Sequence, residues 1–197
     1  MDISAAQVKE LREKTGSGMM DCKMALAESG GDTEKAIEIL RKKGMSTAAK
    51  RMGKTTKEGT IASYIHPGSR LGVLVEVNCE TDFVAKTDDF KNFVKDICMQ
   101  IAGANPLVIE KSEVQEEDIE KEREIYRTQA RNEGKPEKIL DKIVDGKLEK
   151  YYEEVCLLNQ AWIKDPQKSI KGLLDEVIGK LGENIVIRRF ARYRLGE

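Results

Sequence analysis

The sequence predicts an α+β fold: three short helices, followed by a three-stranded antiparallel sheet that is packed with helices and carries a helical arm. Apolar residues recur at helical spacing in residues 3–40 and again from Phe90 to Ile101. In residues 71–77, by contrast, apolar and polar residues alternate with a period of two, as in a strand with one buried face. This change of period along the chain is why we expect both helices and a sheet.

The first 45 residues predict a compact module of three helices. Two turn-forming segments, residues 15–18 and 29–32, separate three groups of apolar residues at helical spacing. Asp32 is placed to cap the third helix, and Gly44 is placed to end it. The three apolar faces consist of Ile3, Val8 and Leu11; of Cys22, Ala25 and Leu26; and of Ala36, Ile37 and Leu40. A module of this size is only marginally stable alone.

A basic segment separates this module from the rest of the chain. Residues 41–57 contain seven lysines and arginines and no acidic residue, and the apolar periodicity is lost after Met52. Such a segment, with glycines and several hydroxyl residues, is typical of a linker. We therefore assign residues 1–45 to the three-helix module, 46–57 to a basic linker and 58–197 to an α+β core domain.

The core domain begins with a predicted β-hairpin. Residues 61–65 and 71–77 supply its strands, and His66-Pro67-Gly68-Ser69 supplies the turn between them. Residues 184–194 alternate between apolar and arginine side chains, which also indicates a strand. The simplest place for this last segment is beside the hairpin, as a third antiparallel strand.

Helices are expected around this sheet. A helix that opens at Thr87 or Asp88 carries an apolar stripe and is the natural cover for the sheet. Residues 113–156 are strongly charged and have only a thin apolar stripe, so they predict a solvated pair of helices that forms an arm. Asp165-Pro166 is placed to begin a last helix, which Gly182 closes.

The charge balance and hydropathy argue against several functions. With 34 basic residues, 35 acidic residues and a net charge of -1, the chain is not built as a general binder of nucleic-acid phosphates. No window reaches the roughly 18 consecutive apolar residues of a membrane helix. The N-terminal residues lack the apolar segment of a signal peptide. We therefore expect a cytoplasmic protein with no membrane partner and no specific nucleic-acid partner.

Residues suited to catalysis or metal binding are sparse. The four cysteines form no CxxC pair and have no histidine cluster nearby, so we expect reduced thiols and no zinc site. The single histidine, His66, lies in a turn where no neighbour would orient it. Gly53-Lys54-Thr55 resembles the end of a phosphate-binding loop, but Ala48 stands where that loop needs a glycine. We expect no catalytic residues, no cofactor and no metal.

Two segments do not fit the packing pattern. Phe83 lies in the connection that follows the second strand, outside both the strand period and the helix stripe. It is either a local plug under the sheet or an exposed anchor for a partner. Met19 and Met20, adjacent at a helix start, either pack inward or present a soft contact surface. The residues alone leave both alternatives open.

These segments occur together in a known family. Residues 8–12, 15–23 and 31–37 resemble the N-terminal module of bacterial translation elongation factor Ts. Thr81-Asp82-Phe83-Val84 resembles the exchange motif of that family, and residues 182–190 resemble its closing strand. The match runs essentially from end to end. The chain resembles the short form of the family, because it lacks the duplicated core of the longer members.

The resemblance implies a guanine-nucleotide exchange factor for elongation factor Tu, which it would bind in the GDP-bound and nucleotide-free states. The first module would be ubiquitin-associated-like (UBA-like) and would dock on the nucleotide domain of that GTPase. Asp82 and Phe83 would intrude beside its magnesium site and promote GDP release, and the core would be of dimerisation type, in a homodimer. The residues that match the docking surface of the module are Leu11, Arg12, Met19, Met20 and Lys23.

Two other functions stay open on the residues alone. A UBA-like adaptor with an unrelated second domain would bind its partner through residues 1–45 alone. An RNA-associated factor would use the basic linker and the arginines of the last strand, and its RNA binding would depend steeply on salt. The sparse aromatic residues and the lack of net positive charge count against the RNA-associated factor.

Overall fold

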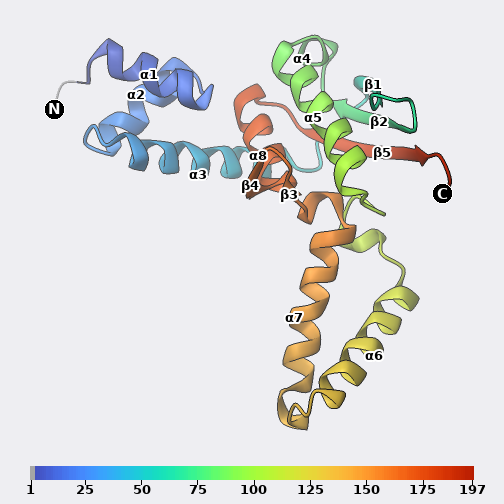
Figure 1. The fold of residues 1–197 in the computed structure, drawn as a ribbon. Coiled ribbons are helices and arrows are strands. Elements are labelled where there is room, and N and C mark those ends of the chain that lie inside the picture. Colours follow the sequence, from blue (N-terminus) through green and yellow to red (C-terminus); the bar gives the residue numbers. More distant parts are fainter. Residues whose placement is uncertain (1–2) are drawn as a thin grey trace. The chain divides into compact units, whose positions relative to one another are not determined.

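A computed structural model describes residues 3–197, and Figure 1 labels their helices and strands. The chain divides into two compact units. The first contains the N-terminal residues through Ile61, together with Glu76–Val94 and Gly172–Arg188. The second contains Ala62–Val75, Lys95–Lys171 and Arg189–Glu197. Each unit is therefore assembled from segments that are distant in sequence.

Three helices form the N-terminal module, as predicted. They are α1 (Ala5–Thr15), α2 (Met19–Glu28) and α3 (Thr33–Arg51). Asp32 caps α3, as expected, by accepting a hydrogen bond of 3.1 Å from the Lys35 N–H. The shared core of the module consists of Val8, Leu11, Cys22, Ala25, Leu26, Ala36 and Leu40. Ile37, which we expected in this core, is exposed instead, and Ile39 packs against the core.

Helix α3 continues past its predicted end. Gly44 lies inside the helix, which ends at Arg51, so the stop predicted at Gly44 is wrong and the first half of the predicted linker is helical. The reason is tertiary packing against α8 (Ile170–Leu181). A Cβ atom on Gly179 of α8 would lie 2.6 Å from the Gly44 Cα, which shows how closely the two backbones cross. Gly179 permits that close approach because it has no side chain to meet the Gly44 backbone, and Gly44 itself continues the helix.

The sheet has the predicted composition and order. Strands β1 (Glu58–Ile65), β2 (Leu71–Cys79) and β5 (Ile185–Arg194) form a three-stranded antiparallel sheet in the order β1-β2-β5. In the hairpin turn the His66 N–H donates a 2.9 Å hydrogen bond to the Leu71 carbonyl. Along β2, Val73, Val75 and Val77 are buried, whereas Leu74 is exposed, which confirms the period of two.

Helix α5 (Asp88–Ala104) begins where the sequence predicts. Thr87 caps it through a 3.3 Å hydrogen bond from the Phe90 N–H to the Thr87 hydroxyl. The short helix η1 (Lys111–Glu113) then leads into the predicted arm. The arm consists of α6 (Glu116–Asn132) and α7 (Glu137–Val155), which lie side by side in Figure 1.

The arm is held together by a thin apolar seam and by ion pairs. Its buried residues are Ala130, Leu140, Val144 and Leu148. Three arginines of α6 pair with acids of α7: Arg123 with Asp145 at 3.4 Å, Arg127 with Asp141 at 3.1 Å, and Arg131 with Glu137 at 2.9 Å. Because these pairs are largely solvent-exposed, each contributes little to stability.

A small second sheet replaces the predicted start of the last helix. After η2 (Leu157–Asn159), strands β3 (Ala161–Trp162) and β4 (Asp165–Ser169) pair in antiparallel fashion. The helix start predicted at Asp165-Pro166 is therefore wrong, because those residues pair in the ladder and α8 begins only at Ile170. Gly182 ends α8 as predicted, with a φ of 73° and an N–H that bonds the Ile178 carbonyl at 2.8 Å.

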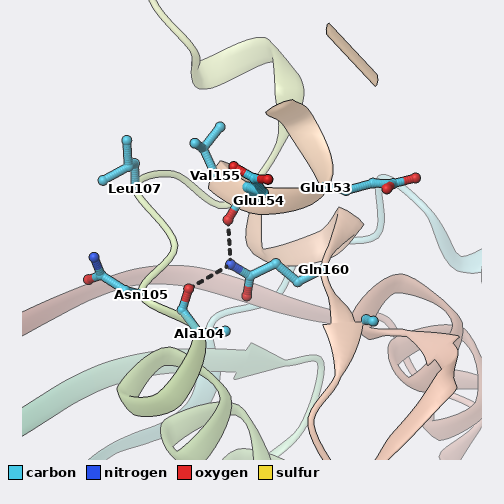
Figure 2. Close-up of a pocket in the computed structure, with 8 residues that line it drawn as sticks. Ala104, Asn105, Leu107, Glu153, Glu154, Val155 and Gln160 are labelled. Carbon is cyan, nitrogen blue, oxygen red and sulfur yellow. Dashed lines mark hydrogen bonds between the residues drawn. The ribbon is translucent and has the colours of Figure 1, made fainter. Parts of the chain in front are cut away.

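Two buried glutamines link the ends of α5 and α7. Figure 2 shows the Gln160 amide between two main-chain carbonyls, those of Ala104 at 3.2 Å and Glu154 at 2.7 Å. Gln100 donates a 3.1 Å hydrogen bond to the side-chain amide oxygen of Gln160 and accepts one of 2.9 Å from the Ile163 N–H. These bonds satisfy both buried side chains, so the base of the arm is fixed by a closed polar network.

The crossing of α3 and α8 gives a prediction with a matched pair of variants. Gly179→Ala forces a methyl group against the Gly44 backbone, so we expect it to destabilise the protein by about 1–3 kcal/mol. In Gly44→Ala the nearest neighbouring atom lies 3.8 Å from the added Cβ, which is an ordinary contact. That variant should leave the free energy of unfolding unchanged, or raise it by up to about 1 kcal/mol, because alanine favours a helix more than glycine does. Urea unfolding measures both; equal stability of the two variants would contradict the close crossing.

Candidate partner-docking site

The predicted exchange motif forms a short helical turn of its own. Helix α4 (Asp82–Ala85) follows β2, and the sequence did not predict it. Thr81 caps this helix, and its hydroxyl accepts a 3.4 Å hydrogen bond from the Val84 N–H. Thr81, Asp82 and Val84 are half-buried, whereas Phe83 projects outward. The turn therefore fixes the backbone under one exposed aromatic ring.

Phe83 is an exposed residue and not a plug under the sheet. Its side chain is 78% exposed, whereas Phe90 and Phe93 of α5 are buried. The Lys86 ammonium lies 6.0 Å from the centre of the Phe83 ring. A large apolar ring held in water at a fixed place is the kind of residue that supplies binding energy once a partner covers it.

Glu183 fastens the turn to the start of β5. One carboxylate oxygen of Glu183 accepts a hydrogen bond of 3.0 Å from the Thr81 N–H, and the other accepts one of 2.6 Å from the Thr81 hydroxyl. The two residues are 102 positions apart in the sequence. This two-point contact to an ionised group is the strong kind of hydrogen bond, so it orients the cap of α4 and, through it, Phe83.

The neighbouring Glu80 ties the same turn to two further segments. Its carboxylate accepts a 2.7 Å hydrogen bond from the Asn184 N–H and pairs with Arg51, at the end of α3, at 3.3 Å. The Asn184 amide donates a 2.8 Å bond to the Lys54 carbonyl. Residues of the basic segment are thus bound to the flank of the exchange motif.

Asp82 lies beside a lysine on the solvent side of the turn. Lys86 donates a 2.5 Å hydrogen bond to the Asp82 carboxylate, one helical turn away. This bond lowers the pKa of Asp82 and raises the pKa of Lys86. Asp82 is therefore ionised at neutral pH, and its charge is locally balanced by the ammonium group.

The predicted contact residues of the N-terminal module divide into two kinds. Arg12, Met19, Met20 and Lys23 are exposed, so they are available to a partner. Leu11 is fully buried in the module core, so in this structure it supports the surface from within. Met19 and Met20 thus follow the second alternative from the sequence, a soft surface rather than an inward packing.

The sequence did not predict the residues that hold the motif. Glu80 directly precedes the motif, and Glu183 and Asn184 lie at the start of the last predicted strand, where a polar residue is usually just solvated. A signal did exist for Glu183 and Asn184, since both lie in the segment that resembles the closing strand of the family. Only the fold, which brings residue 183 to residue 81, shows what Glu183 does.

No group of three or more His, Cys, Asp or Glu among the described residues is arranged to hold a metal ion. Burial raises the pKa of the Cys79 and Cys98 thiols to about 11, so both are neutral at physiological pH. In residues 3–197, no helix has the length and apolar character needed to cross a bilayer.

A surface pocket lies at the base of the arm. Figure 2 shows its lining around Gln160, including the exposed Leu107 and the end of α7. The lining residues are Ala104, Asn105, Leu107, Glu153, Glu154, Val155, Gln160 and Ala161. None of the residues predicted to bind a partner belongs to this set, so the pocket does not contribute to the docking site.

A fixed turn with an exposed aromatic ring and an exposed surface of methionines and basic residues are features typical of proteins that bind a protein partner. Comparison with known proteins specifies the class. The sequence model of the family "Elongation factor TS" matches residues 5–197. The chain belongs to the elongation factor Ts family and is thus a translation elongation factor of protein biosynthesis, which confirms the resemblance seen in its motifs.

Curated relatives match over nearly the whole chain. Elongation factor Ts of Caldanaerobacter subterraneus subsp. tengcongensis is 65% identical over 195 residues, covering 99% of this chain and 98% of the relative. Elongation factor Ts of Syntrophus aciditrophicus is 64% identical over 197 residues, covering 100% of this chain and 98% of the relative. Elongation factor Ts of Desulfitobacterium hafniense is 58% identical over 196 residues, covering 100% of this chain and 90% of the relative.

The contact between Glu183 and Thr81 predicts a local effect on backbone opening. Glu183→Ala removes the acceptor for the Thr81 N–H and hydroxyl. Because a hydrogen bond to a charged group contributes about 1.5–3 kcal/mol, amide hydrogen exchange at residues 81–86 should become at least about tenfold faster. Mass spectrometry of deuterated peptides measures this.

A matched control lies in the other unit. Glu113 also accepts a hydrogen bond from a main-chain N–H, that of Ile109 at 3.0 Å. Glu113→Ala should accelerate exchange near residue 109 and leave residues 81–86 unchanged. Unaltered exchange at residues 81–86 in Glu183→Ala would show that Glu183 does not hold the turn.

Proposed function

We propose that this protein is the guanine-nucleotide exchange factor for elongation factor Tu. Its family implies nucleotide exchange in translation elongation. In this proposal it binds the GDP-bound GTPase, disturbs the magnesium site, releases GDP and leaves a nucleotide-free complex that GTP can reload. The residues that carry the exchange step are Thr81, Asp82, Phe83 and Val84. The protein acts by binding and performs no bond chemistry of its own.

The observation that carries the proposal is the exposure of Phe83 on a fixed turn. The ring is 78% exposed, while the Thr81 cap beneath it is held by Glu183. A wedge must keep its shape when it meets a partner, since any freedom in the free protein has to be lost on binding. The rigid mounting of an otherwise unfavourable exposed ring is what such a wedge requires.

The physical logic links the wedge to the nucleotide. Mg²⁺ bridges the nucleotide phosphates to protein ligands in a GTPase, so moving the segment that supports this ion weakens the binding of both metal and GDP. The coupling is reciprocal: the factor lowers GDP affinity by some ratio, and nucleotide lowers the affinity of the factor by the same ratio. GTP binding therefore releases the factor again.

The N-terminal module supplies the second contact in this proposal. Arg12, Met19, Met20 and Lys23 are exposed on its surface, and we assign them to docking on the nucleotide domain, with Leu11 supporting them from the core. The three-helix module is UBA-like in this proposal, and residues 46–57 connect it to the core domain. The protein works in the cytoplasm, where translation takes place.

The wedge is tested by a double substitution. Asp82→Ala with Phe83→Ala should slow the stimulated release of GDP from elongation factor Tu by about 30-fold or more, because truncating a central anchor costs about 2 kcal/mol or more. A fluorescent GDP analogue reports the release rate in stopped flow.

The control replaces a comparable exposed residue elsewhere. Leu107→Ala removes a side chain that is 65% exposed and lies in the pocket lining instead of the motif, and it should leave the release rate unchanged. Unchanged GDP release with the double variant, at a concentration where the parent protein is fully active, would rule out the wedge.

We also propose that the short form acts as a homodimer, in which the core domain of residues 58–197 pairs two subunits. Light scattering at micromolar concentration should then give twice the chain mass of 22.1 kDa. A mass of one chain, measured under conditions where exchange activity is complete, would contradict the dimer without affecting the wedge.

A further inference from the structure

The methionines of this chain are concentrated on the outside of its N-terminal module. Five of the six methionines in residues 3–197 are exposed, and all five lie in or at the end of α2 and α3: Met19, Met20, Met24, Met45 and Met52. The sixth, Met99 in α5, is half-buried. Methionine is ordinarily a core residue, so this distribution calls for a functional reason.

Three of these methionines form one face of α2. At about 100° per residue, Met19, Met20 and Met24 lie within an arc of about 140°, with Lys23 between them. They are 47%, 66% and 50% exposed, respectively. The opposite arc carries Cys22, Ala25 and Leu26, which are buried in the module core. Met24 thus extends the proposed docking surface of Met19, Met20 and Lys23 along the helix.

The position of this face is fixed by contacts on its flank. Asp21, between the exposed and buried arcs, pairs with Lys43 of α3 at 2.5 Å. The core of the module holds the other side of α2. Because the core residues of α2 lie on its opposite arc, a change in the chemistry of the three methionine side chains alters the exposed surface and leaves those core residues unchanged.

The cysteines, the usual targets of peroxide, are shielded. Cys22, Cys79, Cys98 and Cys156 are all free thiols and all buried. Burial raises the pKa of Cys79 and of Cys98 to about 11 and also raises the pKa of Cys156. Since the thiolate is the form that reacts, these thiols are poor nucleophiles at neutral pH.

From these observations we infer that the face formed by Met19, Met20 and Met24 is a redox-sensitive modification site, at which a peroxide reversibly weakens docking. In each step the thioether sulfur attacks one peroxide oxygen, the O–O bond breaks, a sulfur–oxygen bond forms and water leaves. The sulfur is oxidised by two electrons and hydrogen peroxide is reduced. A methionine sulfoxide reductase, with a thiol reductant, reverses the reaction.

The effect on binding follows from the polarity of the product. A sulfoxide is a strong hydrogen-bond acceptor, whereas a thioether is nearly apolar. Covering the sulfoxide with an apolar partner surface leaves that acceptor without the hydrogen bonds it had in water. The inference rests on the proposed docking of this face to elongation factor Tu. It adds Met24 to the docking surface and makes docking dependent on the oxidation state of the three methionines.

The first measurement maps the oxidation in the free protein. The intact chain is treated with hydrogen peroxide, catalase removes the excess, and peptide mass spectrometry follows each residue with time. Met19, Met20 and Met24 should be oxidised before Met99 and before any cysteine. Oxidation of a cysteine first, or of Met99 as fast as the three, would overturn the inference.

The second measurement compares each protein with its own untreated sample. After oxidation, the concentration of parent protein that gives half-maximal GDP release should rise by about tenfold, and sulfoxide reductase should restore it. Met19→Leu with Met20→Leu and Met24→Leu replaces the face with apolar groups that peroxide does not modify. For this triple variant, the concentration that gives half-maximal GDP release should differ between the treated and untreated samples by no more than about twofold.

A matched variant separates this face from the other exposed methionines. Met45→Leu with Met52→Leu keeps the α2 face, so oxidation should weaken the docking of this variant as much as it weakens the docking of the parent protein. An equal loss in the triple variant, or no loss in the parent, would overturn the inference. If the untreated parent neither binds elongation factor Tu nor accelerates GDP release, both the proposed function and this inference fail. If the untreated parent is active and its activity survives oxidation, only this inference fails.

Discussion

The carboxylate of Glu183 holds the part of the molecule on which its proposed activity depends. An isolated turn of four residues has too few internal hydrogen bonds to keep its shape in water. Here the turn is fixed from outside, through both the N–H and the hydroxyl of Thr81. Glu80 adds contacts to Asn184 and Arg51, so the start of β5 and the end of α3 meet at the same place. The exposed ring of Phe83 is thus carried by tertiary contacts rather than by local propensity.

Two surfaces of different character result. The α4 turn is small and fixed by tertiary contacts, with one exposed ring and a charge-balanced aspartate, as the proposed wedge requires. The methionine face of α2 is broader and made of flexible side chains, which adapt to the surface they meet. A partner engaged by both would be positioned by the soft surface and altered by the rigid one. In the proposed exchange function, this division lets one surface provide binding and the other act on the nucleotide site.

Local patterns in the sequence predicted most of the fold. Alternation in β2, the stripe of α5 and the charged arm depend on neighbouring residues, and they are observed where predicted. The errors arose from distant partners. Gly44 does not end α3, because the helix continues to Arg51 and packs closely against Gly179 of α8, and Pro166 does not begin a helix, because β4 pairs with β3. Likewise, the motif was visible as an oddity, but Glu183, its support, was not, since no local pattern brings residue 183 to residue 81.

The buried pair of Gln100 and Gln160 has a consequence for the arm. Amide groups carry no charge at any accessible pH, and buried hydrogen bonds are hardly screened by salt. Changes in salt concentration therefore have little effect on these hydrogen bonds at the base of the arm. The pairs of Arg123, Arg127 and Arg131 along its length are exposed and weaken as salt rises. Because those exposed pairs contribute little to stability, salt changes the arm little as a whole, and it changes the junction between the ends of α5 and α7 least.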